Sequence, residues 1–211
     1  GGDGRGGSAC FMKQRKTKSI EIETKCLLYE AKKTQSVNTI YLKDKMVIGH
    51  NTDIEGFQLA IKNTNYDING KKVLLLGAGG VSPSIIEALN NMRVNKIFLS
   101  NRTHVKAENL KKRFNEVEVV KWGILPDFDM IVNSTSIGLN SDDSIGIDYT
   151  KIGSGKFFYD VIYNPPETNF LKFAKKIGNK TENGKKMFIY QAQASFKIWN
   201  NLIPKIDNDV M

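Results

Sequence analysis

The clearest pattern in the chain is a series of short apolar runs that alternate with amphipathic segments in its central part. The run Val73–Leu76 ends at a glycine cluster, which is typical of a buried parallel strand entering a tight turn. Further strands are predicted in KIFLSNRT, VEVVKW, DMIVNSTSIG and FFYDVIY, with helices in SPSIIEALNNM and AENLKKRF between them. Strands that alternate with helices predict an α/β fold with a doubly wound sheet.

The segments on either side of this region have weaker patterns. SVNTIYLKDKMVIGHNTD predicts two short strands with a hairpin turn at Lys43-Asp44. A helix is expected around Glu21–Lys33, and the amphipathic segment DIEGFQLAIKN predicts another from Ile54. FLKFAKKIG and YQAQASFKIWNNL predict two closing helices, whereas the glycine-rich first nine residues predict a flexible tail.

Composition excludes several classes of protein. The 211 residues are 40% hydrophobic and 25% charged, which is ordinary globular usage. No apolar run reaches the ~18 residues of a membrane span, and the start has no signal-peptide pattern. With only two cysteines we expect no disulfide framework or cysteine-based zinc site, and no cluster has metal-ligand spacing. We therefore expect a soluble, cytoplasmic protein without a resident metal.

The chain carries 31 lysines and arginines against 22 acidic residues, a formal net charge of +9. The lysines are scattered rather than massed on one arm with interleaved aromatic residues, and no nucleic-acid motif is present. We therefore expect neither a nucleic-acid nor a membrane partner. Lysine-rich composition explains the surplus most simply, and an anionic small-molecule ligand is the main alternative.

The glycine cluster lies where a dinucleotide-binding turn would lie. Gly77, Ala78, Gly79 and Gly80 follow a predicted strand and precede a predicted helix. Gly77 allows a sharp turn, and Gly79 lets the backbone approach a pyrophosphate, towards which the helix would point unpaired N–H groups. A strand-to-helix turn without a ligand can also use glycines, so this motif alone leaves both interpretations open.

The end of the next strand favours NADP over NAD. A site for NAD would present an acidic residue there to bind the ribose hydroxyls. This chain presents Asn101, Arg102 and Thr103, with Lys106 one turn later. The planar guanidinium of Arg102 suits a 2′-phosphate because it donates paired hydrogen bonds. The alternative is a solvated arginine at a helix start.

Two other polar clusters are candidates for ligand contacts. Asn133-Ser134-Thr135-Ser136 ends a predicted strand at the same edge of the sheet. Asn38-Thr39 and Asn51-Thr52-Asp53 form the second cluster, in which Asp53 is a candidate for proton exchange. Chemistry alone favours the alternative that Asp53 caps the helix that follows it, and the adjacent His50 is interpreted as structural.

The motifs together resemble the shikimate dehydrogenase family. The matching stretches are SVNT, GHNTDIEGF, LLLGAGGVSPSII, LSNRTHVKAENL, DMIVNSTSIGL, FYDVIYNPPETNFL and NGKKMFIYQAQASFKIW, in this order between residues 36 and 199. The resemblance implies a Rossmann-type NADP-binding domain and the reversible conversion of shikimate to 3-dehydroshikimate, a step of aromatic amino-acid (chorismate) biosynthesis. It also implies a monomer or homodimer.

The resemblance assigns roles to individual residues. It implies that Asp53 is catalytic, which outweighs the capping interpretation. It implies substrate contacts from Asn38, Asn51, Tyr163 and Gln191. It implies cofactor contacts from Gly77, Ala78, Gly79, Gly80, Asn101, Arg102, Thr103, Lys106, Thr135 and Met187.

The chain also departs from the family. The family's Ser-x-Ser motif and its lysine-bearing Asn-Val-Thr-x-Pro-x-Lys motif are absent, and no motif selects Lys13, Lys16 or Lys18 as a replacement. Lys186 stands where the family usually has a glycine. We therefore predict a partial substrate-binding domain (1–53, with 1–24 atypical), an NADP-binding domain (54–186) and closing helices (187–211). A non-catalytic NADP-binding fragment and a quinate-specific enzyme are the alternatives.

Overall fold

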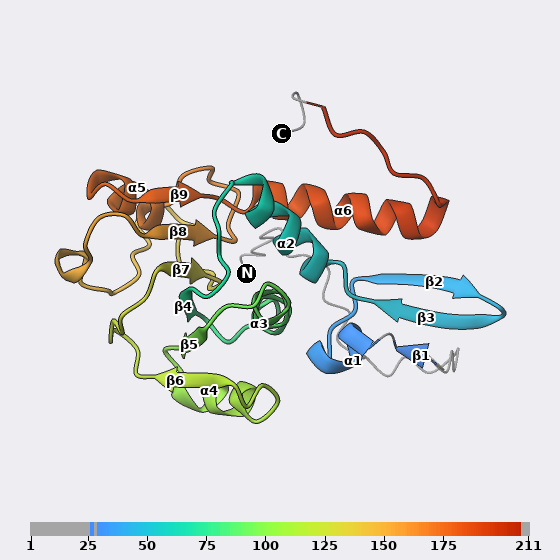
Figure 1. The fold of residues 1–211 in the computed structure, drawn as a ribbon, viewed down its shortest axis with the longest axis horizontal. Helices are drawn as coiled ribbons and strands as arrows, with labels where there is room; N and C mark the ends of the chain where they lie inside the picture. The colour runs from blue at the N-terminus through green and yellow to red at the C-terminus, as the bar shows by residue number, and fades with distance from the viewer. Residues whose placement is uncertain (1–25, 28, 208–211) are drawn as a thin grey trace, which may run out of the picture.

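The computed structural model describes residues 26, 27 and 29–207, and its larger sheet has six parallel strands (Figure 1). In spatial order they are β6 (Val117–Val120), β5 (Lys96–Ser100), β4 (Lys72–Leu76), β7 (Met130–Asn133), β8 (Phe157–Asp160) and β9 (Lys180–Glu182). Counted along the chain this is the order 3-2-1-4-5-6 of a Rossmann sheet. The predicted doubly wound α/β fold is confirmed.

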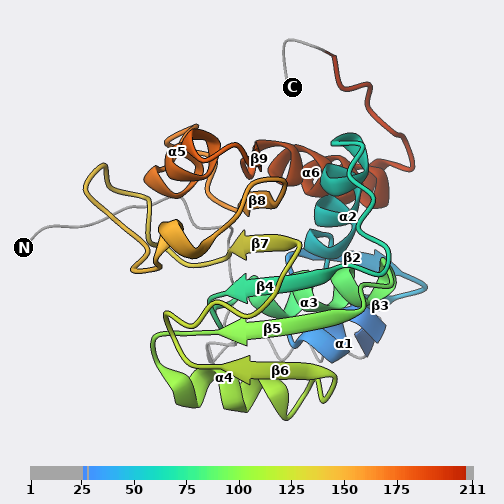
Figure 2. The ribbon, with the colours of Figure 1, turned by 60° about the vertical axis from the view of Figure 1, so that its left-hand side comes forward.

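Helices cover both faces of this sheet, and so its central strands consist mainly of apolar residues (Figure 2). Val73 and Leu75 of β4 pack into one core with α3 (Ser82–Asn91) and α4 (His104–Lys111). Leu74 and Leu76 face the opposite core, which includes residues of α5 (Asn169–Lys176). The continuous apolar run is therefore explained by burial on both sides.

A smaller sheet of order β1-β3-β2 lies beside the larger one. Strands β2 (Thr39–Lys43) and β3 (Met46–His50) are antiparallel, and β1 (Cys26–Leu27) pairs with β3 in parallel. The hairpin is confirmed, but its turn is at Asp44 and Lys45, whose φ angles are +52° and +63°. Positive φ at both positions suits a two-residue hairpin loop.

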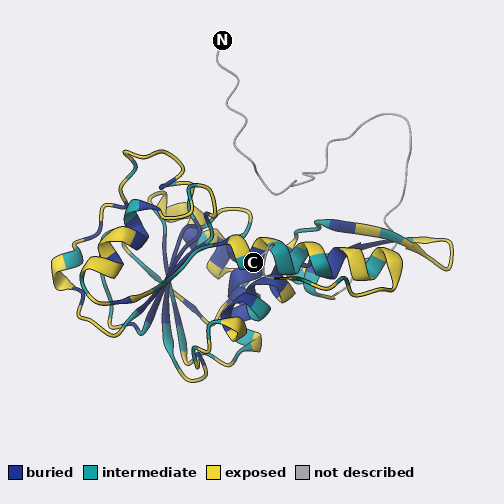
Figure 3. Cartoon of the chain, turned by 90° about the horizontal axis from the view of Figure 1, so that it is seen from above, coloured by how far each residue is buried: buried dark blue, intermediate teal, exposed yellow. Residues whose placement is uncertain are grey.

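One long helix leads from the smaller sheet to the larger one, and a second long helix packs against it. Helix α2 (Asp53–Asn63) leaves the end of β3 and packs along α6 (Lys185–Asn200). A Cβ on Gly56 would lie 2.8 Å from Met187 O, so the two helices can approach this closely only with glycine there. The buried residues concentrate around the larger sheet and along this helix pair (Figure 3).

Three predictions of secondary structure need correction. The helix expected over Glu21–Lys33 begins outside the described residues, and within them the chain forms β1 first and then α1 (Tyr29–Thr34). Backbone pairing of Cys26–Leu27 with β3 outweighs the local helical pattern there. The last closing helix begins at Lys185 rather than near Tyr190, so it spans the predicted boundary at residue 186. Strand β9 was not predicted, because its Lys-Thr-Glu sequence has no apolar residue.

Among the described residues, no helix is long and apolar enough to cross a membrane. The division into domains at residues 53 and 186 remains a prediction.

Candidate active site

The glycine turn opens at the carboxyl edge of the larger sheet, between β4 and β7, where the strand order reverses. Gly77 has φ +109°, and a Cβ there would lie 2.8 Å from Ser134 Oγ. The opposite side of the turn is open, because a Cβ on Gly79 would meet only Ser134 O, at 4.0 Å. Crevices at such a reversal are where Rossmann sheets bind their ligands. The turn therefore fits the approach of an anionic group to its backbone.

Three N–H groups of this turn are hydrogen-bonded within the protein. Gly77 N donates to Ser100 O at 2.8 Å, Ala78 N donates to Asn101 Oδ1 at 3.1 Å, and Gly79 N donates to Ser82 Oγ at 3.0 Å. These bonds fix the shape of the turn. Asn101 ties the turn to the end of β5, and its Nδ2 donates to Thr103 O at 2.7 Å.

Three of the residues predicted to bind the adenosine phosphate lie exposed beyond the end of β5. Arg102 and Thr103 precede helix α4, and Lys106 lies in its first turn. Cations at a helix N-terminus oppose the helix dipole, so they are unfavourable there without an anion. An exposed arginine and lysine on one side of the crevice fit a phosphate group.

Asp53 and Asn38 meet at the start of α2, which Asn51 links to Ser84 of α3, the helix that follows the glycine turn. Asp53 is the first residue of α2 and is only 4% exposed. Asn38 Nδ2 donates to Asp53 Oδ1 at 2.9 Å, so an asparagine ahead of the hairpin holds a carboxylate that follows it. The N-cap of α2 is Thr52, with no side-chain cap. The capping interpretation of Asp53 is therefore wrong.

Burial raises the pKa of Asp53, and the hydrogen bond from Asn38 partly opposes this rise. A carboxylate with a raised pKa is a stronger base than an exposed aspartate. The pair thus combines a fixed geometry with a proton affinity suited to general-base chemistry.

Asn51 is hydrogen-bonded inside the protein, and its contact with substrate remains a prediction. It is 2% exposed, and its Nδ2 donates to Thr34 Oγ1 at 3.0 Å and to Ser84 Oγ at 2.9 Å. Its Oδ1 accepts from Asp53 N at 3.0 Å. Asn51 therefore holds the start of α2 in place through its hydrogen bond with Asp53 N.

Gln191 on α6 lies near the start of α2, and Tyr163 in the loop after β8 packs on the same part of α6. Thr52 Oγ1 lies 3.5 Å from Gln191 Oε1, which places Gln191 beside the residue that precedes Asp53. The ring of Tyr163 stacks on Phe188 at 4.9 Å, and Phe188 O accepts from Gln191 Nε2 at 3.0 Å. Phe188 is thus an aromatic neighbour of both residues that the motif comparison did not single out.

Thr135 and Met187 occupy contrasting positions. Thr135 is half-buried at the end of β7, where its Oγ1 donates to Asn133 Oδ1 at 2.7 Å. Met187 is 6% exposed and packs in the core with residues of α2 and β8. Only Thr135 therefore offers substantial surface to a ligand in this conformation.

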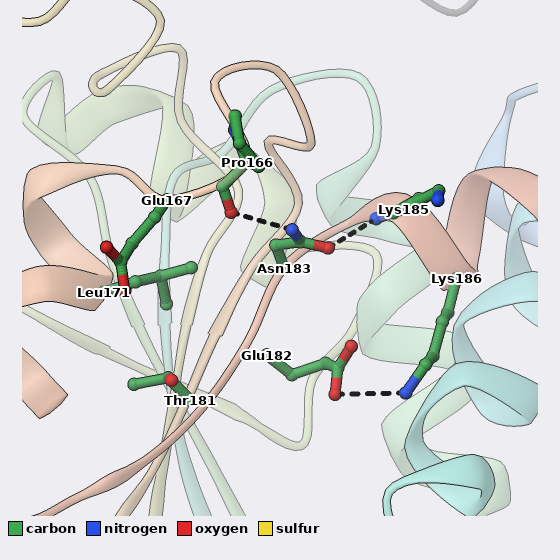
Figure 4. A pocket seen from close by; sticks show the side chains of 8 residues that line it. All are labelled: Pro166, Glu167, Leu171, Thr181, Glu182, Asn183, Lys185 and Lys186. Atoms are coloured by element: carbon green, nitrogen blue, oxygen red, sulfur yellow. Dashed lines mark hydrogen bonds and ion pairs between the residues drawn. The ribbon is translucent and has the colours of Figure 1, made fainter. Parts of the chain in front are cut away.

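Lys186 points towards β9, along the edge of a pocket of 290 Å³ (Figure 4). Its Nζ lies 3.4 Å from Glu182 Oε2, so the lysine is paired inside the protein. Asn183 closes the same pocket by donating to Pro166 O at 2.8 Å and accepting from Lys185 N at 3.0 Å.

Asp160, the last residue of β8, is a buried residue that was not selected from the sequence. Its Oδ1 accepts from Asn133 Nδ2 and Ile162 N, both at 3.0 Å, and its Oδ2 accepts from Thr168 Oγ1 at 2.6 Å. It therefore joins the loop carrying Thr135 to the loop carrying Tyr163. The sequence signal that could have identified Asp160 is an acidic residue inside the otherwise mainly apolar stretch FFYDVIY.

Burial raises the pKa of Asp160 from 3.8 to about 6, despite its three hydrogen bonds. A native-state pKa above the unfolded-state value means that the native state binds more protons, so stability falls as pH rises through this range. We expect Asp160 to lower the free energy of unfolding by about 3 kcal/mol between about pH 4 and pH 7. Denaturant titrations of the wild type and of Asp160→Asn at both pH values measure this. Equal pH dependence in the two proteins would contradict the assignment.

Lys13, Lys16 and Lys18 lie outside the described residues, so their relation to Asp53 stays a prediction. Among the described residues, no group of three or more His, Cys, Asp or Glu side chains is arranged to hold a metal ion.

Comparison with known proteins identifies the family. The sequence profile of the shikimate / quinate 5-dehydrogenase family matches residues 58–140. The NADP(+) shikimate dehydrogenase of Pelagibacter ubique is 59% identical over 182 residues, covering 86% of this chain and 69% of its own.

Solved structures agree. Shikimate dehydrogenase from Aquifex aeolicus matches with a TM-score of 0.78 and 36% identity, over 85% of this chain and 66% of its own. Shikimate 5-dehydrogenase from Thermus thermophilus, solved with NADP(H) and shikimate, matches with a TM-score of 0.78 and 28% identity, over 85% and 67%. This chain thus spans about two thirds of the length of these relatives. It belongs to the shikimate dehydrogenase family.

Proposed function

We propose that the chain interconverts shikimate and 3-dehydroshikimate with NADP as the redox partner, in aromatic amino-acid biosynthesis in the cytoplasm. The observation that carries this proposal is the buried Asp53 carboxylate, which Asn38 holds at 2.9 Å and whose neighbour Thr52 contacts Gln191. Family membership supplies the substrate, and the Asp53 pair supplies a group that can manage its proton.

In the oxidation direction, the ring carbon of shikimate loses its hydrogen as hydride while its hydroxyl loses a proton. NADP+ supplies the hydride acceptor when it is bound. Asp53 receives the hydroxyl proton, because burial raises its pKa and Asn38 fixes the orientation of its carboxylate. The products are the ketone and NADPH, and Asp53 later releases its proton to water. Gln191 and Tyr163 orient the substrate.

The cofactor is held by the crevice residues. The turn Gly77–Gly80 would receive the pyrophosphate, Thr135 would contact the cofactor from the end of β7, and Met187 would lie near the nicotinamide. Arg102, Thr103 and Lys106 would bind the adenosine phosphate, with Asn101 fixing the turn from behind. The open side of the turn at Gly79 supports this assignment.

Replacing Arg102 by alanine is expected to raise the Kd for NADP+ by about 10- to 100-fold, since a charge-assisted contact to phosphate is lost. The Kd for NAD+, which has no 2′-phosphate, is expected to stay the same. Calorimetric titration of both cofactors measures the two constants. Lys111→Ala removes the same charge from the other end of α4 and serves as the control. Equal weakening of both cofactors by Arg102→Ala would contradict the assignment.

Quinate is a second candidate substrate, because the family whose profile matches includes quinate dehydrogenases. Competition between shikimate and quinate for the cofactor-bound chain distinguishes the two. The remaining alternative, a non-catalytic NADP-binding module, predicts cofactor binding with no turnover of either compound.

A further inference from the structure

A buried group of three hydroxyls lies next to Asn38, the hydrogen-bond partner of Asp53. It consists of Thr39 and Thr52, each 0% exposed, and Ser195 of α6, which is 6% exposed. Ser195 Oγ lies 2.7 Å from Thr39 Oγ1 and 3.0 Å from Thr52 Oγ1. One hydroxyl on the last helix therefore holds two threonines that precede it by 156 and 143 positions in the chain.

Both threonines act on the same atom, the side-chain oxygen of Asn38. Thr39 Oγ1 and Thr52 Oγ1 each lie 3.1 Å from Asn38 Oδ1, and Thr52 N donates to it at 2.9 Å. Because each hydroxyl has one hydrogen, the three hydroxyls connect to Asn38 as a chain, in which Thr52 donates to Ser195, Ser195 donates to Thr39, and Thr39 donates to Asn38 Oδ1. A backbone N–H can only donate, so it fixes the amide with its oxygen towards Thr52. The Nδ2 group of Asn38 must then face Asp53, which it does.

The hydroxyl of Ser195 is unusual for its position. Inside a helix, alanine is more favourable than serine, and a buried hydroxyl is costly unless it is hydrogen-bonded. Ser195 Oγ also lies 3.0 Å from Gln191 O, one turn earlier on α6. The same hydroxyl thus contacts the helical turn that carries Gln191 and the two threonines that orient Asn38.

We propose that Ser195 is a positioning residue, which acts through Thr39 and Thr52 to fix the amide of Asn38 and thereby the carboxylate of Asp53. This inference rests on the proposed function, in which Asp53 receives the substrate's proton. It assigns the closing helix a role in orienting the acid–base pair, in addition to carrying Gln191.

The test compares Ser195→Thr with Ser195→Val, because the two introduced side chains have the same shape and only threonine retains the hydroxyl. We expect Ser195→Val to shift the Asn38 side-chain amide signals in ¹⁵N NMR spectra and to raise the pKa of Asp53, because the opposing hydrogen bond from Asn38 weakens. It should also weaken shikimate binding by about tenfold relative to Ser195→Thr, as expected for a lost hydrogen bond near a charged group. The Kd for NADP+ should be equal in both variants.

Ser100→Ala serves as the control, since it removes another fully buried hydroxyl, which bonds to Lys121 O far from Asp53. Thermal unfolding of all variants separates stability from positioning. Unchanged Asn38 signals and an unchanged Asp53 pKa in Ser195→Val would overturn the inference, even if that variant is less stable. Failure of the wild type to bind shikimate would instead overturn the proposed function and, with it, this role of Ser195.

Discussion

Replacing Asp53 by asparagine is expected to lower kcat for shikimate oxidation by about 10²–10⁴-fold, the usual contribution of a general acid–base group. Asparagine has the same shape and can still accept the hydrogen bond from Asn38, so the local geometry should persist. The side chain is 4% exposed, and burial disfavours its charged form. The free energy of unfolding should therefore stay equal or rise. Initial rates and denaturant titrations of the same preparation measure both.

Asp67→Asn is the matched control, because Asp67 is an exposed turn residue that accepts only a local bond, from Asn69 N at 3.1 Å. Its kinetics should equal those of the wild type. If Asp53→Asn retained wild-type kcat, or lost activity only because it unfolded, the acid–base role of Asp53 would be wrong.

Replacing Gly184 by alanine is expected to destabilise the fold by at least about 3 kcal/mol, the upper end of the usual cost of overpacking. The added Cβ would lie 2.0 Å from Val161 O and 2.5 Å from Val161 C. Both are backbone atoms, so no side chain can swing aside. The start of α6 or the end of β8 must then move, which would also displace Tyr163 and Gln191. Urea titration of the variant measures the loss.

Gly153→Ala provides the comparison, because a Cβ there meets no atom within 4 Å and the backbone is not in the left-handed region. Its stability should match the wild type or rise slightly, since alanine restricts the unfolded chain. Equal stabilities of the Gly184 and Gly153 variants would contradict the close contact between Gly184 and Val161.

The larger sheet could be predicted because its strands are buried on both faces and therefore read as apolar runs. Val73–Leu76 is the clearest example. Strand β9 lacks this signal, since it is a polar strand at the edge of the sheet. The short strand β1 depends on pairing with β3, a contact that no local pattern encodes.

The candidate site could be predicted only in part. The motifs identify Asp53 and Asn38, and the structure brings these two side chains together. The motifs do not distinguish a residue that contacts a ligand from one that holds the fold together, however. The hydrogen bonds of Asn51, which only the structure shows, are made inside the protein. Ser195 could not have been selected from sequence, because its role depends on contacts between distant segments of the chain.

The central claim is that this chain oxidises shikimate with NADP+. The most direct test is the initial rate of NADPH formation by the purified chain with shikimate, run beside a titration of NADP+ binding. We expect NADPH to form in equal amount with 3-dehydroshikimate, and its formation to be lost in Asp53→Asn. Binding of NADP+ without any shikimate-dependent NADPH formation would contradict this claim and would favour a non-catalytic cofactor-binding module.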